Sequence, residues 1–269
     1  MTQTPSQIRD LLRRYQIAPR KSLGQHFLAD PNITAKIAAL APVALPIVEV
    51  GAGTGALTVA LADAGHEVIA YEVDERLRPV LEEVLEGVTG VELRFADAMD
   101  VDLADDVAAS KWALVGNLPY NIATPLILDV LRHVPAVGRF VVMVQTEVAE
   151  RFVARPGTKS YGVPSVVTQL YGLPALEFRV PPQLFVPPPA VGSAVIIIDR
   201  RPDVRSSASR AADLAAAAFG QRRKMIRSSL ADAVPNLTDV LARAAVADDL
   251  RADALRPADY LAIAEAEAA

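Results

Sequence analysis

The sequence predicts an α/β fold in which a mostly parallel, doubly wound sheet precedes a small helical domain. Short β-rich runs alternate with amphipathic helical stretches through the first two hundred residues, and this alternation requires right-handed crossover connections. After Asp199, helical stretches follow one another with no strand between them. We therefore expect two domains, residues 1–200 and residues 201–269.

The expected elements follow from the spacing of apolar residues. Strands are predicted at 47–50, 67–72, 91–97, 113–119, 140–145, 175–180 and 194–199. Helices are predicted between the earlier strands at 57–64, 75–85 and 123–131, and after them at 211–219, 222–233, 237–245 and 257–264. In a doubly wound sheet, ligands bind beyond the carboxyl ends of the strands. Functional residues are therefore expected directly after the first four strands.

The composition excludes several classes of protein. Hydrophobic residues make up 52% of the 269 residues, so the chain can bury a core and is not intrinsically disordered. There is no cysteine, which excludes disulfides, thiolate zinc sites and cysteine nucleophiles, and three histidines leave little material for a metal site. We expect no metal, no membrane span and no signal peptide, and hence a cytoplasmic protein.

Basic residues gather in two places although the net charge is −5. Residues 1–30 carry 5 basic and 2 acidic groups, and residues 200–230 carry 8 basic and 2 acidic groups. Such clusters can form a local footprint for a polyanion such as RNA. Alternatively, the second cluster is a solvated helix face, or pairs with the tail after residue 230, which has 8 acidic and 3 basic groups.

A glycine-rich turn, G-A-G-T-G at 51–55, closes the first strand and opens a helix. Glycines let the backbone turn tightly and approach a ligand closely. Glu72 ends the second strand, where a carboxylate can accept hydrogen bonds from ribose hydroxyls, and Asp97 ends the third, where it can accept from an adenine amine. This pattern fits both NAD and S-adenosylmethionine, and the acidic surroundings favour a cationic sulfonium over a pyrophosphate.

The fourth strand ends in Asn117-Leu118-Pro119-Tyr120. The exocyclic nitrogen of adenine is a poor nucleophile because its lone pair is delocalised, and two acceptors on its hydrogens would free that lone pair. Asn117 offers a side-chain carbonyl and Leu118 a backbone carbonyl, whose direction Pro119 restricts. Tyr120 offers a face for a flipped base. Phe185, in a proline-rich loop, is either a second wall for that base or a core aromatic.

Together these motifs resemble a known family. K-S-L-G-Q-H-F-L at 21–28, the glycine loop, Asn117–Tyr120 and the Phe185 loop are similar, in this order, to the ribosomal RNA adenine dimethyltransferases, and to the branch that acts on the bacterial small subunit. R-P-G-T-K-S-Y-G at 155–162 and Q-R-R-K-M-I-R-S-S-L at 221–230 also match, so the similarity covers about residues 11–264.

The resemblance implies a Rossmann-like, seven-stranded, S-adenosylmethionine-dependent methyltransferase sheet with a small all-helical, RNA-binding C-terminal domain. It implies dimethylation, at the exocyclic N6, of two adjacent adenines in the 3′-terminal hairpin loop of 16S ribosomal RNA. The predicted partner is this RNA in the immature small subunit, bound by a monomer.

The resemblance also implies roles for particular residues. The cofactor contacts would be His26, Leu28, Gly51, Glu72, Asp97 and Asn117. The catalytic group would be Asn117, Leu118, Pro119, Tyr120 and Phe185, and the RNA contacts Lys21, Arg222, Arg223, Lys224 and Arg227. Two positions depart from the family: His26 stands where many relatives have Asn, and Ala96 where they often have Gly.

Three alternative functions are compatible with parts of the sequence. The large-subunit RNA adenine methylases of macrolide resistance usually have N-I-P-Y followed by His, so Leu118 and Asn121 favour the small-subunit branch. A NAD-dependent dehydrogenase would fit the glycine loop and Glu72 but would leave Asn117 and Tyr120 without a role. A ribosome-assembly factor without enzymatic activity would not need the acceptor motif.

Overall fold

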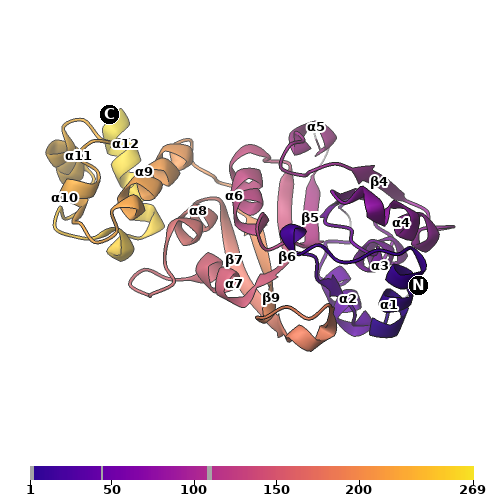
Figure 1. Ribbon diagram of the computed structural model, residues 1–269. Coiled ribbons are helices and arrows are strands. Elements are labelled where there is room, and N and C mark those ends of the chain that lie inside the picture. Colours follow the sequence, from indigo (N-terminus) through magenta and orange to yellow (C-terminus); the bar gives the residue numbers. More distant parts are fainter. Residues whose placement is uncertain (1–2, 44, 108–110) are drawn as a thin grey trace. The chain divides into compact units, whose positions relative to one another are not determined.

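A computed structural model describes residues 3–43, 45–107 and 111–269 of the chain (Figure 1). Within these residues, seven strands form one sheet in the order β4-β3-β2-β5-β6-β9-β7. They are β2 (Ile47–Val50), β3 (Val68–Glu72), β4 (Val91–Phe95), β5 (Trp112–Asn117), β6 (Val137–Gln145), β7 (Gly172–Val180) and β9 (Ser193–Arg200). All seven predicted strands are confirmed, and so is the α/β fold class.

The strand order fixes where a ligand can bind. β2 pairs in parallel with β3 and with β5, so the chain runs outward from β2 to β4 and then crosses back to the other side of β2. β5 pairs in parallel with β6, and β9 is antiparallel to β6. The order reverses between β2 and β5, and the carboxyl ends of these two strands border the crevice that doubly wound sheets use for ligands.

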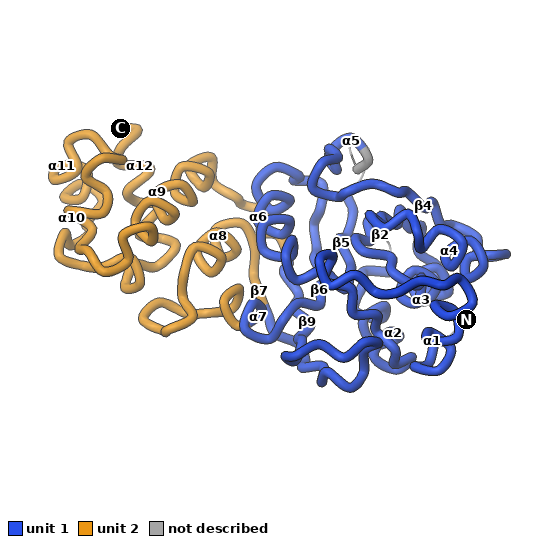
Figure 2. The backbone as a smooth tube through the Cα atoms, in the orientation of Figure 1, with its two compact units in different colours: residues 1–149, 175–199 blue, residues 150–174, 200–269 orange. Residues whose placement is uncertain are grey.

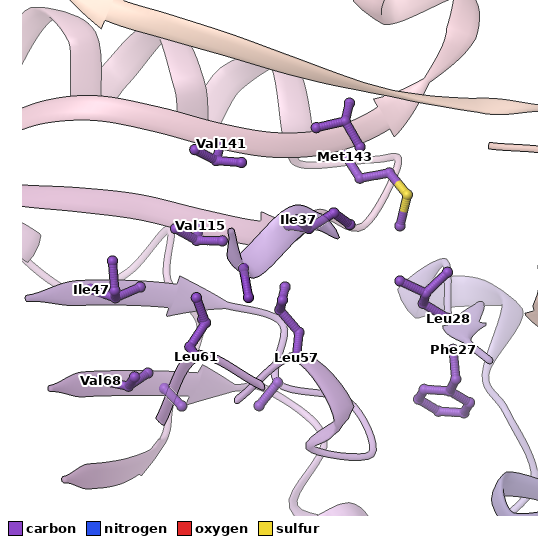
Figure 3. Close-up of a cluster of buried hydrophobic side chains, with 14 of the residues drawn as sticks. Phe27, Leu28, Ile37, Ile47, Leu57, Leu61, Val68, Val115, Val141 and Met143 are labelled. Carbon is purple, nitrogen blue, oxygen red and sulfur yellow. The ribbon is translucent and has the colours of Figure 1, made fainter. Parts of the chain in front are cut away.

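The core lies on both faces of the sheet, as expected for buried parallel strands. On one face, Ile47, Val68, Val115 and Val141 pack in a cluster with side chains from the neighbouring helices (Figure 3). Each such buried side chain contributes roughly 1.5–3 kcal/mol relative to an exposed one. The glycine loop and the ends of the strands are therefore held by a rigid frame.

Helices and a small second sheet surround the strands. The helices are α1 (Pro5–Arg14), α2 (Pro31–Ala38), α3 (Ala56–Asp63), α4 (Arg78–Val84), α5 (Leu103–Val107) and α6 (Ala123–His133). Thr4 forms a capping box with Gln7 at the start of α1, and Asp30 caps α2. The predicted helix 75–85 is a 3₁₀ turn, Glu75–Leu77, followed by α4. Two strands of two residues each, β1 (Phe27–Leu28) and β8 (Phe185–Val186), pair antiparallel.

The chain forms two compact units (Figure 2). Unit 1 comprises the described parts of residues 1–149 and 175–199, and unit 2 comprises residues 150–174 and 200–269. The remaining helices are α7 (Thr146–Val153), α8 (Val163–Tyr171), α9 (Ala208–Gly220), α10 (Ile226–Ser229), α11 (Leu237–Arg243) and α12 (Pro257–Ala268). Within the described residues, no helix is long and apolar enough to cross a membrane.

Unit 2 contains a segment that the sequence pattern placed with the sheet. Residues 150–174 pack with the C-terminal helices, because the Tyr161 hydroxyl donates to the Leu255 carbonyl (2.9 Å) and the Gly157 amide donates to the Asp253 carbonyl (2.7 Å). The division of the chain into a methyltransferase domain, residues 1–200, and an RNA-binding domain, residues 201–269, stays a prediction.

The predicted helix 222–233 is wrong over most of its length. Residues 221–224 form a turn, and α10 has only four residues. The amides of Ile226 and Arg227 donate to the carbonyls of Leu250 and Asp248 instead of to the preceding turn of a helix. The basic residues at 222–224 therefore lie in a turn and do not open a long helix.

Candidate active site

A cavity opens at the carboxyl ends of β2, β3 and β5, in unit 1. It contains about 1070 Å³ of empty space, its open mouth included. Its lining comes from residues 23–28, 49–54, 56–57, 71–73, 96–98 and 117–122. All six predicted cofactor contacts line it: His26, Leu28, Gly51, Glu72, Asp97 and Asn117.

The glycine loop needs glycine at particular positions. Gly53 has φ +58°, a left-handed conformation, and a Cβ there would lie 3.1 Å from the Phe27 ring. The loop is also braced from the N-terminus: Gln3 donates its amide to the Thr54 carbonyl (2.7 Å), and the Thr54 hydroxyl donates to Gln3 Oε1 (2.6 Å). No sequence pattern points to Gln3, because the contact joins residues 51 positions apart.

Glu72 connects the glycine loop to the end of β3. Its side chain is 5% exposed, and its two oxygens accept from the amides of Gly53 (2.8 Å) and Asp74 (2.9 Å). Burial raises the pKa of this carboxyl, while the backbone hydrogen bonds oppose the rise. Each carboxylate oxygen keeps a second lone pair. The carboxylate is thus oriented at the cavity wall and can still accept hydroxyl hydrogens.

Asp97, which follows β4, also lines the cavity. One of its oxygens accepts from the Met99 amide at 2.9 Å, which fixes the side chain in a turn after β4. The carboxylate is half-buried and lines the cavity between Ala96 and Ala98. It can accept from an amine there, as the sequence predicts.

Asp74 anchors the segment before His26 to the cofactor side of the sheet. Its carboxylate accepts from Gln25 Nε2 (2.9 Å) and from Arg76 Nη2 (2.5 Å), and Arg20 Nη1 lies 3.7 Å away. The hydrogen bond from Arg76 is the main reason why the pKa of Asp74 is lowered to about 2. No motif points to a role for Asp74, although it stands only two residues after Glu72.

The acceptor motif lies beside the glycine loop, where the Asn117 backbone carbonyl would be 3.5 Å from a Cβ on Gly51. The side chain of Asn117 donates its amide to the His26 carbonyl at 3.0 Å, and because a carbonyl only accepts, this bond identifies the nitrogen. Oδ1 is then the side-chain atom left to accept from a substrate. The Leu118 amide donates to the Met143 carbonyl (3.1 Å), while the Leu118 carbonyl accepts no hydrogen bond from any described residue.

The two aromatic candidates differ in position. Tyr120 lines the cavity, and its hydroxyl is 3.1 Å from Ser193 Oγ. Burial raises the pKa of Tyr120, so its hydroxyl stays protonated. Phe185 is 1% exposed, packs in the core cluster opposite Leu28 and does not line the cavity. This position matches the alternative of a core aromatic, and a role of Phe185 as a second wall for the base stays a prediction.

Glu49 also lines the cavity, although none of the motifs points to it. Its side chain is 1% exposed, and neither carboxylate oxygen has a hydrogen-bond partner among the described residues. Desolvation by burial raises its pKa to about 7. The sequence feature that could have revealed Glu49 is a carboxylate within the strand I-V-E-V at 47–50, whose other three residues are apolar.

The predicted RNA contacts fall into two groups. In unit 2, Arg222 lies 3.6 Å from an Asp253 oxygen and Arg227 lies 3.8 Å from an Asp248 oxygen. Both acids belong to the tail after residue 230, in agreement with the alternative that the second basic cluster pairs with this tail. Within the described chain, the exposed side chains of Arg223 and Lys224, and of Lys21 in unit 1, have no hydrogen bond or ion pair.

The cavity fits S-adenosylmethionine better than a dinucleotide. It has a close-approach glycine cradle and three carboxylates, Glu49, Glu72 and Asp97, and no Lys or Arg is among the described residues that line it. The ionisable side chains with a formal charge in the lining are acidic, which favours a sulfonium over a pyrophosphate. Among the described residues, no group of three His, Asp or Glu is arranged to hold a metal ion.

The doubly wound seven-stranded sheet and this cavity are those of an S-adenosylmethionine-dependent methyltransferase. The sequence profile of the family described as ribosomal RNA adenine dimethylase matches residues 17–268. The chain belongs to this family.

Individual relatives agree with this assignment. The ribosomal RNA small subunit methyltransferase A of Pelotomaculum thermopropionicum is 41% identical, over 97% of this chain and 96% of its own. That of Rhodospirillum rubrum is 42% identical, over 96% and 91%. Among solved structures, a dimethyladenosine transferase from Plasmodium falciparum superposes with a TM-score of 0.73 at 25% identity, over 88% of this chain and 96% of its own. The 23S rRNA methyltransferase ErmE gives 0.68 at 28% identity, over 90% and 100%.

Proposed function

We propose that this protein methylates the exocyclic N6 of two adjacent adenines in the 3′-terminal hairpin loop of 16S ribosomal RNA, twice each, in the immature small subunit. The observation that carries the proposal is the wall formed by Asn117, Leu118 and Tyr120, which stands directly beside the glycine loop. The small-subunit methyltransferase relatives, at about 40% identity over nearly the whole chain, support the choice of RNA.

The residues of the wall act by alignment. When bound, S-adenosylmethionine supplies a methyl group on a positively charged sulfur. In the first transfer to each base, Oδ1 of Asn117 and the carbonyl oxygen of Leu118 accept the two N6 hydrogens, which draws the nitrogen toward a tetrahedral geometry and directs its lone pair at the methyl carbon. In the second transfer, one of these two oxygens accepts the single N6 hydrogen that remains. Tyr120 packs on the face of the base. The proton leaves to solvent after transfer, so the site needs no strong base, and correct orientation accounts for most of the rate.

Removal of the cofactor carboxylates is the first test of the donor side. Glu72→Ala and Asp97→Ala are each expected to weaken S-adenosylmethionine binding by roughly 1–3 kcal/mol, the cost of losing a hydrogen-bond partner in a desolvated site. Isothermal calorimetry measures this, with Glu75→Ala, an exposed carboxylate on the next turn, as the matched control. Unchanged affinity in both variants, or tighter binding of NAD than of S-adenosylmethionine, would contradict the assignment.

The RNA contacts predict a change in salt dependence. Arg223 and Lys224 are exposed and unpaired, so Arg223→Ala combined with Lys224→Ala removes phosphate contacts without breaking an ion pair of the fold. Each lost contact is expected to reduce the slope of log affinity against log salt by about 0.7–0.9. Filter binding of small subunits between low and moderate salt measures the slope.

The double variant Arg9→Ala with Lys111→Ala removes the same charge from exposed positions of unit 1 and serves as the control. If the control loses as much of the slope of log affinity against log salt, the binding depends on the net charge of the protein and not on Arg223 and Lys224 in particular. Arg222→Ala and Arg227→Ala are expected instead to lower the melting temperature, because both side chains lie within 4 Å of acids of unit 2.

The proposed function is tested on the RNA itself. Small subunits that lack the modification are incubated with the protein and labelled S-adenosylmethionine, and the RNA is digested and analysed by mass spectrometry. Two neighbouring dimethyladenosines near the 3′ end of 16S RNA are expected. Modification of 23S RNA alone would favour the large-subunit branch, and binding without modification would favour an assembly factor. Sedimentation of the protein tests the predicted monomer, and cell fractionation tests the predicted cytoplasmic location.

A further inference from the structure

His26 joins three segments of unit 1 at the acceptor side of the cavity. Its ring Nδ1 is 2.8 Å from the Pro187 carbonyl oxygen, and its own backbone carbonyl accepts the amide of Asn117 at 3.0 Å. Its ring stacks on Tyr120, with the centroids 5.7 Å apart and the planes 27° from parallel. One residue therefore contacts both side chains of the proposed acceptor wall.

Tyr120 is held at two separate points. His26 covers part of its ring, and Ser193 Oγ lies 3.1 Å from its hydroxyl. Ser193 is 0% exposed and begins β9, so this end of the ring is tied to the sheet. A ring fixed at its face and at its hydroxyl can neither swing nor tilt freely. The plane on which a base would stack is thus set before the base arrives.

The imidazole is in turn fixed from its other side. The carbonyl of Pro187 belongs to the loop between β8 and β9, and β8 pairs with β1, the strand that directly follows His26. Offset-stacked aromatic pairs are favoured by their quadrupoles as well as by the area they bury. The ring of His26 consequently has a defined position from which to orient Tyr120.

We propose that His26 is a positioning residue for the acceptor adenine: its ring sets the plane of Tyr120, and its carbonyl sets the amide of Asn117. The proposal rests on the proposed function, because it needs a base on Tyr120. It assigns the imidazole to the acceptor side, whereas the family resemblance implies only a cofactor contact at this position. A displacement of about 1 Å at a reacting group can cost on the order of 100-fold in rate.

The test separates the ring from its hydrogen bond. His26→Phe keeps an aromatic ring beside Tyr120 and loses the bond to Pro187, whereas His26→Ala loses both the bond and the ring. Single-turnover methyl transfer is measured at saturating subunit and saturating S-adenosylmethionine, and cofactor affinity is measured separately by calorimetry. We expect His26→Phe to transfer methyl groups about 10-fold faster than His26→Ala when both variants are saturated with cofactor, so a loss of cofactor affinity in either variant does not enter the comparison.

Other outcomes overturn the proposal. If His26→Ala transfers methyl groups at the rate of His26→Phe, the ring has no positioning role. If both variants lose cofactor affinity but reach the native rate at saturation, His26 serves the donor side. His133→Phe, at an exposed histidine paired with Asp129 in α6, controls for the substitution itself, and melting temperatures exclude misfolded variants. The proposed function is tested separately, by identifying which RNA the native protein modifies. A wrong RNA would contradict the proposed function, whereas equal rates in the two His26 variants would contradict only the positioning role.

Discussion

Replacement of Asn117 by alanine is expected to lower the rate of methyl transfer by at least about 100- to 1000-fold, the usual cost of losing one preorganised polar group at a reacting centre. The substitution removes Oδ1, which is proposed to accept an N6 hydrogen, and it also removes the amide that donates to the His26 carbonyl at 3.0 Å. Binding of the small subunit should persist, because phosphate contacts elsewhere supply most of the affinity.

Two measurements on one preparation check this result. Filter binding gives the affinity for small subunits, and transfer of labelled methyl groups gives the rate. Asn32→Ala removes an exposed amide from the first turn of α2 and should leave both unchanged. Near-native turnover by the Asn117 variant would place the acceptor site elsewhere, and loss of subunit binding would mean that Asn117 holds the RNA instead of aligning the amine.

The frame of the sheet could be predicted because its signal is local. Buried parallel strands are continuous apolar runs, and each carries its own pattern. β1 and β8 could not be predicted, since two residues are too few to show an alternation of apolar and polar side chains. These two strands form only because they pair with each other. The same holds for residues 150–174, whose place in unit 2 depends on hydrogen bonds to carbonyls about a hundred positions later.

The site could be predicted where function follows the end of a strand. Glu72, Asp97 and Asn117 lie at or just beyond the ends of β3, β4 and β5, and topology alone brings such positions together. Phe185 shows the limit of this reasoning, because the proline-rich loop fixes its backbone without deciding whether its ring faces the cavity or the core.

Asp74 and Gln3 show a second limit. Each supports the cavity from behind, through hydrogen bonds to residues about fifty positions away in the sequence. An isolated aspartate or glutamine carries no pattern that would reveal such a bond. Residues that touch a ligand can be predicted from topology, but those that hold the ligand-binding loops in place require the structure.

Glu49 provides the other large expected effect, which concerns stability. Its pKa is about 7 in the folded protein, because burial disfavours the charged carboxylate, against an ordinary value of 4.5. Below the ordinary value the group is protonated in both the folded and the unfolded states and costs nothing. As the pH rises toward 7, the unfolded state loses its proton first, so the folded state is progressively destabilised. Above pH 7 the full penalty applies, about 3 kcal/mol at roughly 1.36 kcal/mol per pKa unit.

Glu49→Gln removes this titration and should change the pH dependence with a definite sign. The amide brings its own cost, about 1–3 kcal/mol for unpaired polar atoms in a buried site, but that cost does not vary with pH. The free energy of unfolding of the variant, relative to the native protein, should therefore rise by about 3 kcal/mol between pH 4.5 and pH 8. Urea unfolding of the ligand-free protein at several pH values measures this difference, and Glu86→Gln, at an exposed position, is expected to show none.

The comparison also tests whether the floor of the cavity is dry. Asp74, whose pKa is lowered mainly by Arg76, titrates in both proteins, so its contribution cancels in the difference. Glu72 repels the Glu49 carboxylate, so the measured difference includes this repulsion as well as the desolvation of Glu49. If the free energies of unfolding of the two proteins change in parallel with pH, water enters the cavity and solvates the Glu49 carboxylate. Burial would then not raise the pKa of Glu49. A difference that grows with pH would instead show a carboxyl group retained at the cavity floor at the expense of stability, which is typical of positions kept for function.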